Sequence, residues 1–179
     1  RYTDNALRLF FEKAKKQEWF HNTIFVITAD HISESVDPQY LTDLGGFKIP
    51  IVIYAPGMSK YKDYNKTKIM SQIDIMPTVL GMLGYDKPYV AFGQDVFNTK
   101  PSDTFTFNYL PGNGYYQFLQ GDWMLQFDGE KVVHAYEFKT DTLQKNDVKE
   151  RCPKEYEQRI KSVIQQYMYR MNHNQLVEK

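Results

Sequence analysis

Two short apolar runs in the first half of the chain predict two buried strands. Residues 24–29 (IFVITA) are mostly branched or aromatic, and residues 49–55 (IPIVIYA) repeat this composition before Pro56 and Gly57 end the run. A nearly continuous apolar run is typical of a parallel strand that is covered on both faces of its sheet. We therefore expect residues 24–29 to form a central parallel strand.

Apolar residues at helical spacing occur before the first of these runs and after the second. Residues 4–17 carry apolar side chains at positions 7, 10, 11 and 14, which predicts an amphipathic helix. Residues 74–83 show a second apolar face, with Pro77 in the first turn and Gly84 as the stop signal. Strands that alternate with helices in this way indicate a doubly wound, mainly parallel α/β sheet.

The pattern changes after Pro101. Short aromatic-rich runs, separated by Gly, Pro, Asn and Asp, occupy residues 104–109, 115–119, 123–127 and 132–138. Such runs predict a small four-stranded antiparallel sheet. Pro153 then opens a helix whose apolar stripe we expect to cover one face of that sheet. We divide the chain accordingly into an α/β core, residues 1–100, and a subdomain of antiparallel sheet plus C-terminal helix, residues 101–179.

Composition excludes several kinds of partner. The chain has 22 Lys and Arg against 22 Asp and Glu and shows no basic stripe, so nothing points to nucleic acid. No apolar run approaches the roughly 20 residues that a membrane-spanning helix requires. The single cysteine, Cys152, cannot form a disulfide within the chain.

Asp30 and His31 directly follow the first apolar run. In open α/β sheets, polar residues just beyond the carboxyl end of a strand lie where ligands bind. A carboxylate placed there requires a cation, hydrogen bonds or solvent, and a carboxylate beside an imidazole suits zinc, manganese or iron. The pair therefore predicts a divalent metal site. The competing interpretation is structural, with Asp30 capping the next turn and His31 solvated.

Several further segments appear along the chain in a recognisable order. They are Asp30-His31, Ile49-Pro50, residues 74–78 (DIMPT), residues 93–95 (GQD), and residues 135–138 (AYEF) with Asp141 and Asn146. This order, from Tyr2 to about Asn146, resembles the carboxyl-terminal part of the alkaline phosphatase and sulfatase superfamily. In particular, it is similar to the sulfatase domain of the lipoteichoic acid synthase branch.

The resemblance implies an alkaline phosphatase-like α/β/α fold in which Asp30 and His31 ligate the catalytic metal. Arylsulfatases have Asp-Asn at this place and hold calcium, so His31 favours manganese or zinc. The implied substrate is a phosphate or sulfate ester, which is attacked by a Thr or Ser nucleophile. In the synthase branch the substrate is lipid-linked and the transferred group is glycerol phosphate, whereas other relatives transfer phosphoethanolamine. The implied full-length parent is anchored in a bacterial membrane and faces the extracytoplasmic side.

The sequence departs from the family pattern in one respect. In the family, the nucleophile and an acidic metal ligand lie upstream of this strand, and only 29 residues precede Asp30 here. We therefore assign no catalytic residue. We expect an incomplete metal site, because a catalytic zinc normally takes three protein ligands. We also expect the chain alone to have no activity. The strands that are absent would leave an exposed sheet edge that favours self-association.

Two functional hypotheses follow. In the first, the chain is the carboxyl-terminal fragment of a metal-dependent phosphotransferase or of a sulfuric or phosphoric ester hydrolase. In the second, it is a non-catalytic α/β interaction module in which Asp30 and His31 are structural. A sulfatase proper is a third possibility, which a comparison of sulfate and phosphate esters as substrates would distinguish.

Overall fold

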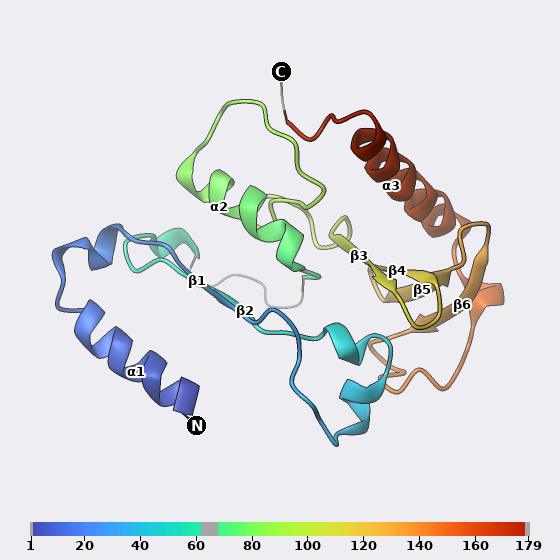
Figure 1. Ribbon diagram of the computed structural model, residues 1–179, viewed down its shortest axis with the longest axis horizontal. Helices are drawn as coiled ribbons and strands as arrows, with labels where there is room; N and C mark the ends of the chain where they lie inside the picture. Colours follow the sequence, from blue (N-terminus) through green and yellow to red (C-terminus); the bar gives the residue numbers. More distant parts are fainter. Residues whose placement is uncertain (1, 62–67, 178–179) are drawn as a thin grey trace. The chain divides into compact units, whose positions relative to one another are not determined.

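The computed structural model describes residues 2–61 and 68–177, and within them the chain forms two compact units. The first unit comprises residues 2–29 and 50–61, and the second comprises residues 30–49 and 68–177. Figure 1 shows the elements of both units in the colours of the sequence. The second unit begins at Asp30, so the candidate metal pair belongs to it.

The first unit is built around aromatic side chains. It contains helix α1 (Tyr2–Ala14), a 3-10 turn (Glu18–Asn22), strand β1 (Phe25–Thr28), strand β2 (Ile51–Tyr54) and a second 3-10 turn (Ser59–Tyr61). Phe20 is almost fully buried and contacts Phe25 and Tyr54, whose rings stack at a centroid distance of 5.9 Å. Phe11 of α1 contacts the same two rings. The predicted helix is therefore confirmed, and Phe10 and Phe11 of its apolar stripe both contact the Phe25 ring of β1.

The two strands of the first unit run antiparallel, with Phe25 opposite Tyr54 and Thr28 opposite Ile51. The expectation that residues 24–29 form a parallel strand covered on both faces is therefore wrong for this strand pair. In the described residues, Val26 and Val52 lie on opposite faces of the ribbon and stay 36% and 48% exposed. An apolar run indicates a buried strand, but it carries no information about strand direction, which depends on how the connection returns the chain.

The second unit contains a four-stranded antiparallel sheet in the order β3-β4-β5-β6. The strands are β3 (Phe105–Leu110), β4 (Tyr115–Gln120), β5 (Trp123–Phe127) and β6 (Val132–Glu137). The bounds of each strand agree with its predicted run to within one residue. The four predicted strands and their antiparallel arrangement are thus confirmed.

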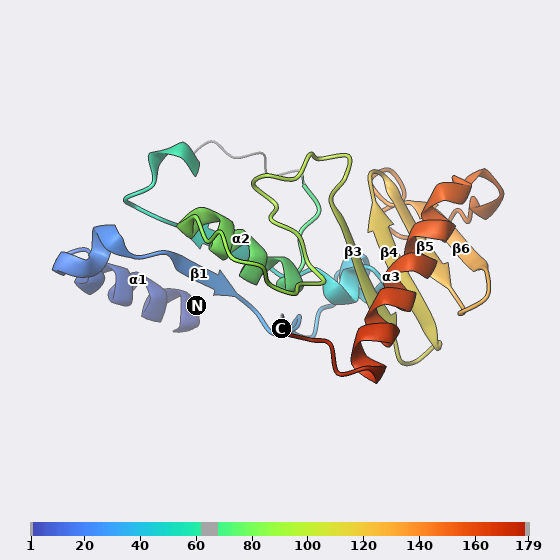
Figure 2. The ribbon, with the colours of Figure 1, turned by 90° about the horizontal axis from the view of Figure 1, so that it is seen from above.

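Helix α3 (Lys154–Asn172) covers one face of this sheet, as predicted and as Figures 1 and 2 show. Ile160 is fully buried and packs against Phe118, Leu125 and Phe127, which are each at most 1% exposed. Burial of side chains of this size contributes about 1.5–3 kcal/mol each. This cluster is the main hydrophobic core of the second unit.

The remaining elements of the second unit are helix α2 and several short turns. Helix α2 (Ile75–Leu83) follows directly on a 3-10 turn (Gln72–Asp74) and ends at Gly84, which has a positive φ of 70°. The connection from Asp30 to Pro50 contains two more 3-10 turns (Pro38–Leu41 and Gly45–Phe47), and a last one (Lys149–Arg151) precedes α3. In the part of the chain that the structure describes, no helix is both long and apolar enough to cross a membrane.

Candidate metal centre

Asp30 and His31 lie side by side with their side chains turned toward one another. Strand β1 ends at Thr28, so the pair stands just past its carboxyl end. The Asp30 Oδ2 and His31 Nε2 atoms are 3.4 Å apart, and Asp30 Oδ1 accepts a hydrogen bond from the His31 backbone N–H at 2.9 Å. Both side chains are largely exposed, at 86% for Asp30 and 78% for His31. The predicted pair is thus brought together at an accessible position.

The backbone fixes which nitrogen of His31 can bind a cation. His31 Nδ1 lies 2.6 Å from the carbonyl oxygen of Ile32. Since a carbonyl oxygen only accepts, Nδ1 must donate, and in the neutral imidazole the free lone pair is then on Nε2. Metal-binding histidines generally use their second ring nitrogen in this way.

The distance between the two donor atoms agrees with a shared cation. A tetrahedral zinc holds nitrogen and oxygen ligands at about 2.0–2.2 Å, which places any two of them about 3.4 Å apart. If neither a cation nor a proton lay between them, the Nε2 lone pair and the Asp30 carboxylate would face each other as two hydrogen-bond acceptors, with no donor between them. The alternative occupant is a proton, which would make the pair an imidazolium–carboxylate ion pair.

Two donors do not make a closed site. Among residues 2–61 and 68–177, no cluster of three or more His, Cys, Asp or Glu side chains is arranged to hold a metal ion. A catalytic zinc normally has three protein ligands. The residues present therefore fit one side of a metal site, and a complete site requires further ligands.

A side-chain amide ties Asp30 to the start of helix α2. Gln72 Nε2 donates to the backbone carbonyl of Asp30 at 3.2 Å. Gln72 opens the 3-10 turn that leads into α2, and Ser71 and Asp74 form a capping box around this turn. Asp74, the first residue of the segment 74–78, thus helps to hold this turn beside Asp30 and is not itself a proposed metal ligand.

Asp74 holds that turn in place from the interior. It is only 1% exposed, and its two carboxylate oxygens accept from the backbone N–H groups of Ser71 and Gln94, each at 2.7 Å. Burial raises the pKa of the Asp74 carboxyl, and the hydrogen bonds from Ser71 and Gln94 oppose this change. Asp74 therefore joins the start of α2 to the segment at residues 93–95.

The 3-10 turn before α2 and helix α2 itself each approach the residue 93–95 segment closely at a glycine. A Cβ at Gly93 would lie 2.1 Å from the Ile73 carbonyl oxygen, and a Cβ at Gly81 would lie 1.9 Å from Asp95 Oδ2. The fully buried Thr78 hydroxyl also donates to the Gln94 carbonyl oxygen of this segment at 3.3 Å and accepts from the Val96 backbone N–H just beyond it at 3.2 Å. Close packing and hydrogen bonding between residues 73–81 and 93–96 therefore explain why Gly, Thr and Asp occur in these two segments.

A row of polar side chains crosses the sheet on the face opposite α3. Asn108, Gln117, Gln126 and His134 stand opposite one another on β3, β4, β5 and β6. Gln126 Nε2 donates to Asp43 Oδ2 at 2.5 Å, and Gln117 Nε2 reaches the Asp43 backbone carbonyl at 3.5 Å. The row therefore anchors the long connection that begins with Asp30 and His31.

Two contacts tie the segment after β6 to this part of the unit, one to the long connection and one to the polar row. The Gln144 side chain accepts from the Leu44 backbone N–H at 3.1 Å, and His134 Nδ1 bonds to Asp147 Oδ2 at 2.8 Å. Burial would raise the pKa of Asp147, but hydrogen bonds from His134 and from the backbone of Ala135 and Lys149 outweigh it and lower that pKa. The polar row was not predictable from the sequence, because its members align only once the strand register is known.

Three comparisons with known proteins point to the same superfamily. The family described as Sulfatase matches residues 1–85. Lipoteichoic acid synthase 1 of Bacillus subtilis is 33% identical over 120 residues, which cover 60% of this chain and 18% of that protein. Lipoteichoic acid synthase of Staphylococcus aureus is 30% identical over 115 residues, which cover 55% of this chain and 17% of that protein.

A solved structure matches nearly the whole chain. It is a protein in the alkaline phosphatase superfamily from Vibrio parahaemolyticus, with a TM-score of 0.78 and 25% sequence identity over 99% of this chain. The chain is similar to proteins of the alkaline phosphatase and sulfatase superfamily. Its alkaline phosphatase-like α/β fold class and its likeness to lipoteichoic acid synthases, both predicted from the sequence, are thereby confirmed.

The superfamily matches also show how much of such proteins this chain represents. It spans under a fifth of the length of the two lipoteichoic acid synthases and 42% of the solved Vibrio chain. The comparisons therefore show the fold and a likeness to the superfamily for this stretch, and the activity of a whole superfamily protein is a matter of proposal.

The Asp74 contacts generate a test. Asp74→Asn replaces one accepting oxygen by an NH2 group, which then faces a backbone N–H of Ser71 or Gln94. An unsatisfied buried donor costs about 1–3 kcal/mol, so we expect the free energy of unfolding, measured by urea titration, to fall by that amount. Asp86→Asn, at an exposed position, is the matched control and should change it by less than about 0.5 kcal/mol. Equal effects of the two substitutions would contradict the proposed role of Asp74.

Proposed function

We propose that this chain is the carboxyl-terminal part of a metal-dependent transferase or hydrolase that acts on phosphate or sulfate esters. The likeness to the superfamily supports the general class, and the likeness to lipoteichoic acid synthases favours transfer of glycerol phosphate or phosphoethanolamine from a lipid-linked donor. The single observation that carries the proposal is the Asp30–His31 pair, with an oxygen and a nitrogen donor 3.4 Å apart at the end of β1.

The roles of the residues in this chain are limited. Asp30 Oδ2 and His31 Nε2 are the proposed ligands of a divalent ion, and manganese or zinc suits this donor pair better than calcium, which prefers oxygen alone. Such an ion, when bound, lowers the pKa of a hydroxyl nucleophile and stabilises negative charge on the ester oxygens. Ile32 fixes the His31 tautomer through its carbonyl, and Gln72 holds the Asp30 backbone.

We further propose that the catalytic nucleophile and the remaining ligands belong to the part of a superfamily protein that this chain does not represent. The short share of the relatives' length that it covers supports this view. The chain alone is then inactive. For the whole protein, the likeness to the synthases supports a membrane-anchored enzyme with its catalytic domain on the extracytoplasmic side of a bacterial membrane.

A metal titration tests the proposed ligands. We expect Mn²⁺, added to the isotope-labelled chain, to broaden the NMR signals of residues 30–32 before any others, because a paramagnetic ion relaxes nearby nuclei most strongly. Asp30→Asn and His31→Gln should each weaken this broadening by about tenfold or more in Mn²⁺ concentration, since each removes one of two ligands. Asp37→Asn and His21→Gln, at exposed positions, are the matched controls.

The same variants in a protein extended upstream of residue 1 address the reaction. There, Asp30→Asn and His31→Gln should abolish transfer of glycerol phosphate and hydrolysis of phosphate and sulfate esters, assayed in parallel. Selective Mn²⁺ broadening that survives both substitutions would reject the ligand assignment. In that case the structural interpretation of the pair, as an interaction module without catalysis, would stand.

Self-association through the β1–β2 ribbon is a second proposal. In the described residues the ribbon has two strands only, and Val52 of β2 is 48% exposed. Short apolar strands with unpaired edges favour pairing with another chain. We expect analytical ultracentrifugation to show concentration-dependent association that Val52→Lys reduces, because a charge at the edge opposes pairing. Ser59→Lys, at an exposed position of the same unit, is the control, and a monomer at every concentration would contradict the proposal.

A further inference from the structure

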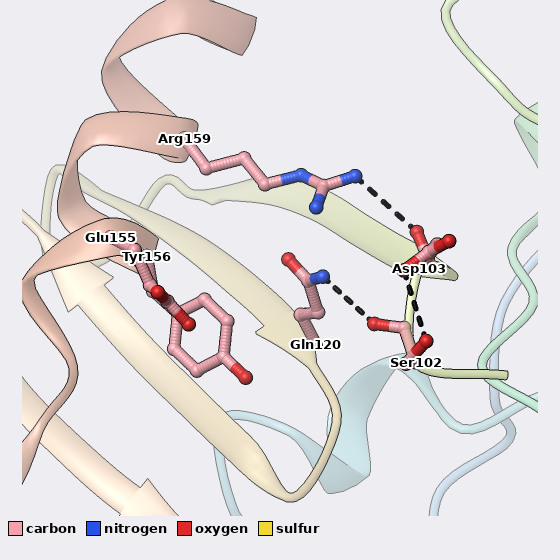
Figure 3. Close-up of a pocket in the computed structure, with 6 residues that line it drawn as sticks. All are labelled: Ser102, Asp103, Gln120, Glu155, Tyr156 and Arg159. Carbon is pink, nitrogen blue, oxygen red and sulfur yellow. Dashed lines mark hydrogen bonds between the residues drawn. The ribbon is translucent and has the colours of Figure 1, made fainter.

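A pocket lies in the second unit where the first turn of α3 meets the end of β4. Its volume is about 450 Å³, within the range of small-molecule sites. The residues that line it are Ser102, Asp103, Gln120, Glu155, Tyr156 and Arg159. Figure 3 shows them on the chain leading into β3, at the end of β4, and on α3. The pocket does not include Asp30 or His31, nor their hydrogen-bond partners Ile32 and Gln72.

Gln120 supplies a buried oxygen without a partner. This last residue of β4 is only 5% exposed, and its Nε2 donates to the Ser102 carbonyl oxygen at 2.9 Å. Because a carbonyl oxygen only accepts, the amide nitrogen must face Ser102, which fixes the position of Oε1. That Oε1 is buried and has no hydrogen-bond donor among the described residues. Figure 3 shows it turned away from Ser102, toward the side chains of α3.

Arg159 supplies donors that are held in place. Its guanidinium stands 5.0 Å from the centroid of the Phe105 ring, and its Nη2 donates to the Asp103 carbonyl oxygen at 3.4 Å. A guanidinium carries five N–H groups, so this contact leaves others for a ligand. The Tyr156 hydroxyl adds a group that can both donate and accept, and it lies over Gly121, where a Cβ would be 3.3 Å from it.

The charges of the lining residues restrict the ligand. Arg159 opposes an organic cation, and the carboxylates of Asp103 and Glu155 oppose an anion such as phosphate. A neutral ligand that both donates and accepts hydrogen bonds satisfies all of these groups. Each hydroxyl group on a sugar-like ring can donate and accept hydrogen bonds through a single oxygen atom.

We propose that this pocket binds a sugar. One ring hydroxyl donates to Gln120 Oε1, which removes the cost of a buried acceptor without a donor. Neighbouring hydroxyls accept from Arg159 and donate to Glu155 or Asp103. The site does not depend on a metal and is independent of the proposed transferase or hydrolase activity.

The test is saturation-transfer NMR on the 179-residue chain in the presence of a chelator. The probes are glucose, galactose, mannose and N-acetylglucosamine, each at about 10 mM, which detects dissociation constants near 1 mM. Phosphate and ethylammonium serve as charged probes. We expect at least one sugar to give a transfer signal, and neither charged probe to compete with it.

Variants locate the binding. Arg159→Gln and Glu155→Gln should weaken sugar binding by about tenfold, as expected for loss of a hydrogen bond to a charged group. Arg170→Gln on the same helix and Glu150→Gln in the preceding turn should leave it unchanged. Gln120→Leu should abolish binding. If this variant fails to fold, Arg159→Gln and Glu155→Gln still test the proposal, because both side chains lie on the surface of the helix. No signal from any sugar, or an equal signal from wild type and pocket variants, would overturn the proposal.

Discussion

The hydrogen bond from His31 Nδ1 to the carbonyl of Ile32 is the interaction on which the metal-site account depends. A carbonyl cannot donate, so this bond assigns the proton of a neutral ring to Nδ1 and leaves Nε2 as an electron-pair donor. The Nε2 atom faces Asp30 Oδ2 at 3.4 Å. Two electron-pair donors held at this separation define one side of a cation site. A proton on Nε2 instead would make the same pair an ordinary surface ion pair, worth about 0–1 kcal/mol.

The positions of Asp30 and His31 depend on contacts from several parts of the second unit. The amide of Gln72 anchors Asp30 from one direction, and Gln72 is itself placed by the buried carboxylate of Asp74. From the other direction, the connection that follows His31 is fixed on the sheet through Asp43 and the polar row of Gln117 and Gln126. The turn at residues 71–74 thus helps to hold the backbone beside two exposed side chains, Asp30 and His31.

Some of this organisation could be predicted from the sequence, for identifiable physical reasons. Alternating aromatic strands with Asp128-Gly129 between two of them define a hairpin locally, so the four-stranded sheet was predictable. The stripe around Ile160 likewise predicted the helix that covers the sheet. The direction of β1 relative to β2 was predicted wrongly, since apolar runs do not encode direction. The polar row and the Gln120 pocket join residues that are distant in sequence, and their alignment follows only from the strand register and the packing of α3.

The most direct test of the central claim is the tautomer of His31, measured by ¹⁵N NMR of the imidazole at about pH 8, above the ordinary pKa of histidine. The account predicts a protonated Nδ1 and an unprotonated Nε2, with the Nε2 resonance shifting when Zn²⁺ is added. His21 and His173, in the same spectrum, serve as internal references. A proton on Nε2 with a free Nδ1, or a resonance that Zn²⁺ leaves unchanged, would contradict it.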